Sequence, residues 1–112
     1  MNQWFRMKQR GYDLEKVLKK KKYNSIAIYG TSYIGERLFD ELRDSDIIVK
    51  YGIDKVKKGK WCGITVFTPE ENLPSVDAIL VTAIYSYNEI VNDLGGKVRA
   101  RIISLEDLLR GD

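Results

Sequence analysis

The segment SIAIYGTSYIGERLFDELRDSDIIVKYGID, residues 25–54, contains the pattern that decides the fold. A short apolar run, Ile26–Tyr29, leads into the turn Gly30–Gly35. A helical repeat over about 33–43 places Ile34, Leu38, Phe39 and Leu42 on one face, and a second apolar run over 47–53 ends at Asp54. A strand, a glycine turn, a helix and a strand followed by an acid form the first unit of a dinucleotide-binding fold. The sequence therefore predicts a class of ligand but no reaction.

The rest of the chain continues this alternation. Strands are predicted at 63–67, 76–83 and 101–104, and capping sequences at Thr68, Ser86 and Ser104 predict helices, the first of barely one turn. The order predicts a Rossmann-like, three-layer α/β sandwich, with a mostly parallel sheet of about five strands and helices on both faces. An amphipathic helix over 13–22 precedes it. We therefore divide the chain into an N-terminal helical segment, residues 1–24, and a nucleotide-binding domain, residues 25–112.

The glycine turn predicts a phosphate-binding site, because N–H groups converge at a helix N-terminus and glycine leaves them unobstructed. Gly30 and Gly35 occupy the first and last positions of G-x-G-x-x-G, whereas Ser32 replaces the middle glycine and weakens the match. The predicted ligand contacts are Gly30, Thr31, Ser32, Tyr33, Ile34 and Gly35. The alternative is that both glycines serve only turn geometry and helix–sheet packing. Glu36 and Arg37 stand where a P-loop needs lysine and a hydroxyl residue, which excludes an ATPase of that type.

Three more residues are expected at the same edge of the sheet. Asp54 follows the turn at roughly the 20-residue spacing at which an acid binds ribose hydroxyls. Its alternative role is that of an ordinary turn residue at a strand end. Ala83 ends the strand 76–83 and Tyr85 lies in the loop that follows it, where Tyr85 is placed to stack on a base or sugar unless it serves ordinary packing.

The chain contains no histidine, which excludes Ser-His-Asp and Cys-His nucleophiles. A zinc site would need carboxylates and the single cysteine, Cys62. The Tyr-x-x-x-Lys pattern of short-chain dehydrogenases occurs at Tyr12–Lys16 and Tyr51–Lys55, but one copy precedes the fold and the other lies on a predicted strand. We therefore expect no catalytic residue and no metal site, and we favour a binding role over an enzymatic activity of the chain on its own, which the sequence leaves open.

Charge and hydropathy limit the partners. The net charge is +3, and the lysines at 19–22 and 55–60 are typical of a solvated surface, so no nucleic acid is expected. No apolar run approaches the roughly 20 residues of a membrane-spanning helix, so no membrane insertion is expected. The N-terminus lacks the apolar stretch of a secretory signal, which favours a cytoplasmic location.

Several stretches resemble a family of bacterial Rossmann-like domains. The similarity is carried by IAIYGTS at 26–32, the acid after the second strand, GITV at 63–66, VDAILV at 76–81 and ISLEDLL at 103–109. Such domains stand at the N-terminus of sugar O-acyltransferases of the sialic-acid O-acetyltransferase type. They also stand at the head of nucleotide-sugar dehydratases of polysaccharide biosynthesis.

The resemblance implies a module that binds a nucleotide or nucleotide-sugar, or NAD(P), in bacterial surface polysaccharide biosynthesis. By the same resemblance, Gly30, Thr31, Ser32, Gly35 and Asp54 would contact the ligand. The acyl-transfer and dehydratase domains of these enzymes have no counterpart in the 112 residues, so the resemblance implies binding and not catalysis. The implied protein partners are a second copy or an enzyme of glycan biosynthesis. The alternative is a ligand-free Rossmann-like interaction domain that binds a protein partner through the N-terminal segment, residues 4–22.

Overall fold

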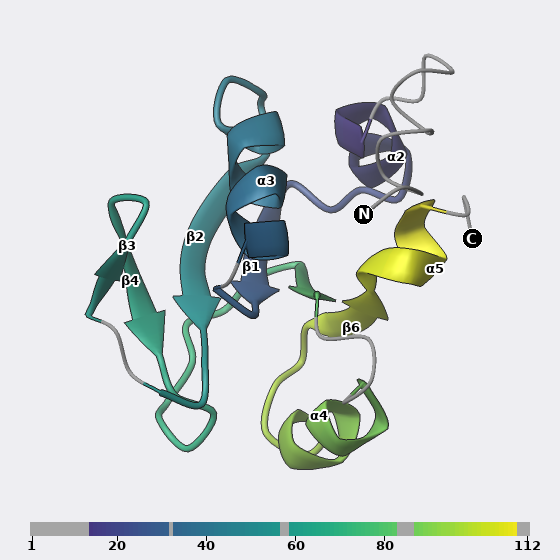
Figure 1. Cartoon of the computed structure of the whole chain (residues 1–112). Coiled ribbons are helices and arrows are strands. Elements are labelled where there is room, and N and C mark those ends of the chain that lie inside the picture. The colour runs from purple at the N-terminus through teal and green to yellow at the C-terminus, as the bar shows by residue number, and fades with distance from the viewer. Residues whose placement is uncertain (1–13, 32, 57–58, 83–86, 110–112) are drawn as a thin grey trace.

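A computed structural model describes residues 14–31, 33–56, 59–82 and 87–109 of the chain (Figure 1). In these ranges the helices are α2 (Leu14–Lys20), α3 (Tyr33–Leu42), α4 (Tyr87–Leu94) and α5 (Leu105–Leu109). The strands are β1 (Ser25–Tyr29), β2 (Ile48–Ile53), β3 (Lys60–Trp61), β4 (Ile64–Phe67), β5 (Ala78–Val81) and β6 (Arg101–Ser104). The predicted α/β class is confirmed.

The strands form one sheet in the order β3-β4-β2-β1-β5-β6. All neighbours are parallel except β3 and β4, which form an antiparallel hairpin. The sheet is therefore mostly parallel, as predicted, but it has six strands in the described residues instead of about five. The additional strand, β3, lies between the predicted strands 47–53 and 63–67, where no strand was predicted. The hairpin turn at Cys62 and Gly63 has φ angles of 54° and 83°, which suit a two-residue turn of the type that hairpins favour.

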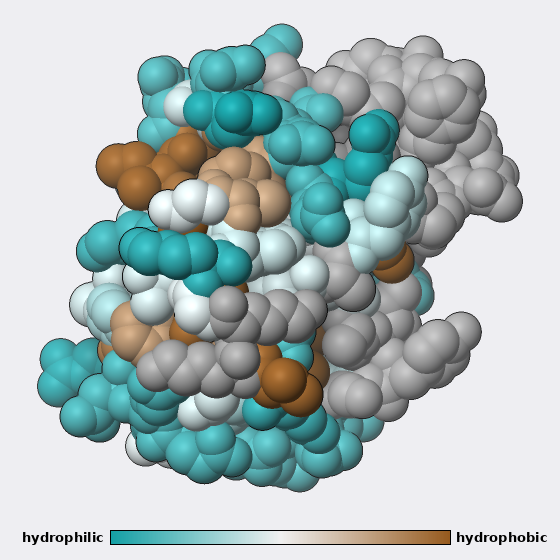
Figure 2. All heavy atoms as spheres, turned by 60° about the vertical axis from the view of Figure 1, so that its left-hand side comes forward, coloured by the Kyte–Doolittle hydropathy of each residue, from teal (hydrophilic) through white to brown (hydrophobic). Residues whose placement is uncertain are grey.

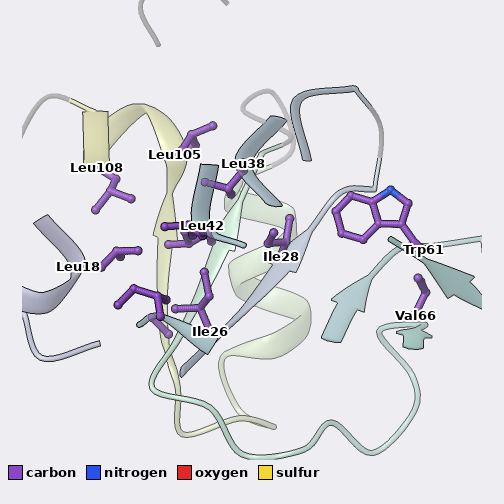
Figure 3. Packing of buried hydrophobic residues seen from close by; sticks show 12 residues of the cluster. Leu18, Ile26, Ile28, Leu38, Leu42, Trp61, Val66, Leu105 and Leu108 are labelled. Carbon is purple, nitrogen blue, oxygen red and sulfur yellow. The ribbon is translucent and has the colours of Figure 1, made fainter. Parts of the chain in front are cut away.

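Side chains alternate across the central strand β1 and so sort the core into two clusters. Ile26 and Ile28 face one side, where they pack with residues of three helices, namely Leu18 of α2, Leu38 and Leu42 of α3, and Leu105 and Leu108 of α5 (Figure 3). Ala27 and Tyr29 face the other side, where Ile90 and Leu94 of α4 pack. Helices α2, α3 and α5 thus cover one face of the sheet, and α4 covers the other.

The N-terminal helix belongs to this core. Helix α2 ends at Lys20, two residues before the predicted end at Lys22, because Lys22 has a φ of 65° and the N–H of Tyr23 donates to the carbonyl of Leu18 (2.9 Å), which closes the helix. A helix of seven residues has little stability by itself. Leu18, however, is fully buried, which stabilises by about 1.5–3 kcal/mol relative to exposure. The packing of Leu18 therefore holds α2 on the sheet.

The helix predicted after Thr68 is wrong. The capping contacts do form, since the N–H and hydroxyl of Thr68 donate to Oε1 of Glu71 at 2.9 and 3.2 Å. The chain then makes only a turn, because Pro74 disfavours a helical conformation for Leu73. An irregular segment therefore connects β4 to β5, and its Leu73 and Val76 pack in the core cluster of α4.

Exposed apolar side chains are scattered on the described surface. The large ones are Tyr33, Ile48 and Val56, which come from three different elements or loops. Figure 2, which brings the β3–β4 side forward, shows separate apolar patches within a largely hydrophilic face. This face therefore presents no broad apolar surface.

Asp77 joins the N-terminal ends of β1 and β5. Its Oδ2 accepts hydrogen bonds from the N–H groups of Asn24 (2.9 Å) and Ser25 (3.1 Å). These bonds hold the pKa of Asp77 below its ordinary value of 3.8. A carboxyl whose pKa is lower in the folded state contributes stability above its unfolded pKa, and that contribution is lost as the pH falls through the folded pKa.

We predict that Asp77→Asn, which keeps the shape and removes the charge, lowers the Tm at pH 7, and that the difference from the wild type shrinks as the pH falls through the folded-state pKa of Asp77, which lies below 3.8. Thermal unfolding followed by circular dichroism from pH 2 to 7 measures this. Asp44→Asn is the control, because it removes the same charge from an exposed aspartate away from the ends of β1 and β5. A Tm difference for Asp77→Asn that is the same at pH 2 and pH 7 would contradict the assignment.

Candidate functional site

The predicted site residues that the structure describes lie at or next to the carboxyl edge of the sheet, around the end of β1. Strands β2 and β5 are the parallel neighbours of β1 and end at the same edge. From β1 the chain adds β2 and β4 on one side, whereas β5 and β6 lie on the other side, so the strand order reverses between β1 and β5. Open parallel sheets bind their ligands in the crevice outside the strand ends at such a point.

Gly30 turns the chain where β1 ends. Its φ is 107°, which side chains disfavour, and its N–H donates to the carbonyl of Ile53 at 2.8 Å. Gly35 lies buried in the first turn of α3, and a Cβ there would stand only 2.1 Å from the carbonyl oxygen of Gly30. Gly30 therefore requires glycine for its backbone conformation and Gly35 requires it for packing, whatever the ligand. This is the geometric role that the sequence had left as the alternative.

Asp54 is hydrogen-bonded to the glycine turn. Its Oδ2 accepts from the hydroxyl of Thr31 (2.7 Å) and from the N–H of Thr31 (3.2 Å). Its Oδ1 accepts from the N–H of Val56 at 3.2 Å. The structure thus brings together the turn and the acid that the sequence had paired. It also shows that both carboxylate oxygens have donors within the chain.

Trp61 covers the turn on the α3 side of the sheet, which the sequence did not lead us to expect. A Cβ on Gly52, in β2, would lie 3.1 Å from Cγ2 of Thr31 and 3.3 Å from Cε3 of Trp61. The indole also packs edge-on against Phe39 of α3, with ring centroids 5.9 Å apart. Its Nε1 is buried and has no hydrogen-bond partner in the described part of the chain. The only sequence signal was a glycine inside a predicted strand, which often marks a close approach.

Tyr29 and Thr82 close the edge on the α4 side. The hydroxyl and N–H of Thr82 both lie 3.0 Å from the carbonyl oxygen of Tyr29, to which they donate. The Tyr29 hydroxyl is buried and has no partner among the described residues. Burial, with smaller contributions from the carboxylates of Asp93, Asp54, Glu70 and Glu89, raises the pKa of Tyr29 from 10.0 to about 12. The phenol is therefore neutral at pH 7, and its surroundings are acidic.

The two remaining predicted contact residues that the structure describes, Tyr33 and Ile34, lie in different surroundings. Tyr33 begins α3 with its side chain 61% exposed at the rim of the edge, whereas Ile34 packs in the core cluster of α3. Ser32, Ala83 and Tyr85 lie outside the described residues. The structure therefore assembles Gly30, Thr31, Gly35 and Asp54 and places Tyr33 next to them.

In the part of the chain that the structure describes, the other candidate catalytic and metal-binding groups do not form a further site at this edge. The Tyr51 hydroxyl donates to the carbonyl of Pro74 (2.7 Å), while Lys55 binds Glu89, so the two members of the Tyr-x-x-x-Lys pattern have different partners. Cys62 is exposed, and partial burial with nearby acidic groups raises its pKa, which disfavours the thiolate. The described residues include no group of three or more potential metal ligands of the His, Cys, Asp and Glu types. Among the same residues, no helix has the length and apolar character to cross a membrane.

Comparisons with known proteins found no match for this chain. No protein-family model matches the sequence, and neither the curated proteins nor the solved structures contain a significant match. The resemblance to domains of sugar acyltransferases and nucleotide-sugar dehydratases therefore stays a prediction.

We predict that Gly35→Ala destabilises the fold by on the order of 1–3 kcal/mol, because the new methyl group would overlap the Gly30 carbonyl and push α3 away from β1. Gly96→Ala is the matched control, since a Cβ at Gly96 meets no atom within 4 Å. Urea denaturation of the two variants and the wild type measures the difference. Equal stability of the two variants would show that α3 does not lie this close to the turn.

Proposed function

We propose that the chain is a nucleotide-binding module with a Rossmann-like, three-layer fold, and that a nucleotide or nucleotide-sugar binds above the end of β1. The observation that carries this proposal is the order of the parallel strands, β4-β2-β1-β5-β6. Numbered along the chain without the hairpin strand β3, this is the order 3-2-1-4-5 of doubly wound nucleotide-binding sheets. Gly30 lies where the order reverses, which is where such sheets bind their ligands.

The helix after the turn supplies an anion site in this proposal. The first N–H groups of α3 have no acceptor within the helix, and the positive end of its dipole faces the edge. Gly35 supports the arrangement because it lets this end of α3 lie directly against the Gly30 carbonyl. A phosphate group of the ligand would accept hydrogen bonds from these N–H groups, as phosphates do at helix N-termini.

Asp54 occupies the position of the ribose-binding acid in such folds. A ribose hydroxyl would have to compete with Thr31 for Oδ2 of Asp54, because the hydroxyl and the N–H of Thr31 already donate to that oxygen. We therefore expect the ligand to replace the Thr31 hydroxyl at Asp54. Links to bacterial surface polysaccharide biosynthesis rest on the sequence resemblance alone.

The same hydrogen bonds favour a second candidate, a ligand-free interaction domain that uses the Rossmann-like scaffold. In that case Asp54 only fastens β2 to the turn, and a protein partner binds the N-terminal segment. Leu18 of that segment is fully buried in the chain's own core, so a partner would have to contact other residues of it.

A ligand panel tests the proposal: NAD, NADP, coenzyme A and UDP-, GDP- and CDP-sugars, measured by the shift in Tm of the purified protein. A ligand at 100 times its Kd should stabilise by roughly 2.7 kcal/mol and raise the Tm by several degrees. We predict a selective response that Asp54→Asn greatly reduces, because the ribose loses its charged acceptor. Asp77→Asn is the control, since Asp77 bonds the opposite end of β1 and should leave the ligand-induced shift intact.

Silence of the wild type across the panel would reject the nucleotide proposal in favour of the interaction domain. A response that Asp54→Asn and Asp77→Asn leave equally intact would place the ligand away from this edge.

A further inference from the structure

An ion pair spans the candidate crevice. Nζ of Lys55 lies 3.1 Å from Oε1 of Glu89. Lys55 follows Asp54 beyond the end of β2, and Glu89 lies in the first turn of α4, after β5. Because β1 lies between β2 and β5, the pair connects the two sides of the strand end that carries Gly30. Figure 1 shows β1 and β2 pointing toward the end of the sheet at which α4 lies.

Among the described residues, Lys55 is a cation close to several acidic side chains. The carboxylates of Asp93, Asp54, Glu70 and Glu89 all act on the buried Tyr29 hydroxyl. The ammonium of Lys97, which follows α4, donates to the carbonyl of Pro69. A phosphate approaching from the α4 side would therefore be repelled unless a cation accompanied it. Within the part of the chain that the structure describes, Lys55, which extends from the loop beside Asp54, is in position to do so.

We propose that Lys55 binds a phosphate group of the ligand and that Glu89 lowers the affinity for that ligand by holding Lys55 in the ion pair. This proposal rests on the nucleotide site proposed above and identifies its charge selectivity. The two side chains are 58% and 62% exposed, so water and salt screen the pair and a stronger acceptor can replace it. A phosphate oxygen is such an acceptor, because it forms short, charge-assisted hydrogen bonds with an ammonium group.

Titration calorimetry of the full chain with inorganic pyrophosphate, at low ionic strength, tests the roles of the two residues. Glu89→Gln should raise the affinity for pyrophosphate by roughly two- to five-fold, since the free energy of an exposed ion pair corresponds to an equilibrium constant of about that size. The gain should shrink at high salt. Lys55→Met should lower the affinity by about ten-fold or more, because it removes a charged hydrogen bond to the anion.

The double variant decides whether Glu89 acts through Lys55. In the Lys55→Met protein, Glu89→Gln should raise the affinity much less than it does in the wild type, because no ion pair remains to be broken and only the direct repulsion of the anion by the carboxylate is removed. An equal gain in both backgrounds would mean that Glu89 merely repels the anion, and it would overturn the proposal. Asp93→Asn is the matched control: it removes the same charge one turn further along α4, and any gain it produces should not depend on Lys55.

The pyrophosphate and nucleotide experiments can fail separately. Lys55-dependent binding of pyrophosphate, without a response to any nucleotide, would support the role of Lys55 and reject the nucleotide function. Nucleotide binding that Lys55→Met does not weaken would support the function and overturn the role of Lys55. Absence of pyrophosphate binding to both the wild type and the Glu89→Gln protein would also overturn it.

Discussion

Strand β1 is hydrogen-bonded on both edges and buried on both faces, and the other elements are placed against it. Its neighbours β2 and β5 run parallel to it, and its side chains alternate between the two core clusters. Two neighbouring parallel strands have to be joined by a connection that crosses a face of the sheet. The chain leaves β1 through α3 on one face and leaves β5 through α4 on the other, so both faces are covered around a single central strand.

The chemistry of the carboxyl edge follows from this arrangement. On the α3 side, Gly30, Gly35 and Gly52 let the turn, the helix and Trp61 approach one another closely, and helix N–H groups make that side electropositive. On the α4 side, carboxylates surround the neutral phenol of Tyr29. Asp54 and Thr31 lie between the two sides and are bonded to each other. In the site that we propose, an anionic ligand group would therefore lie near α3, and near α4 only together with Lys55.

Local patterns predicted the parts of the fold whose stability is local or strongly periodic. Strand β1, helix α3 and helix α4 appear within a few residues of their predicted positions, because a buried strand and an amphipathic helix each repeat their signal. Strand β3 was missed because two residues carry no period, and only their pairing with β4 makes them a strand. The helix after Thr68 was overpredicted because a capping sequence cannot extend a helix toward Pro74.

The sequence by itself determined the α/β class, the glycine turn after the first strand and the pairing of that turn with an acid after the second strand. These features depend on which residue types follow one another over short stretches, because such stretches set the local backbone conformation and the face to which each side chain points. Only the tertiary structure decided that Asp54 already accepts hydrogen bonds from Thr31, that Trp61 packs over Gly52, and that Lys55 meets Glu89. These contacts join residues far apart along the chain, and their partners depend on strand order and register, which short-range patterns do not encode.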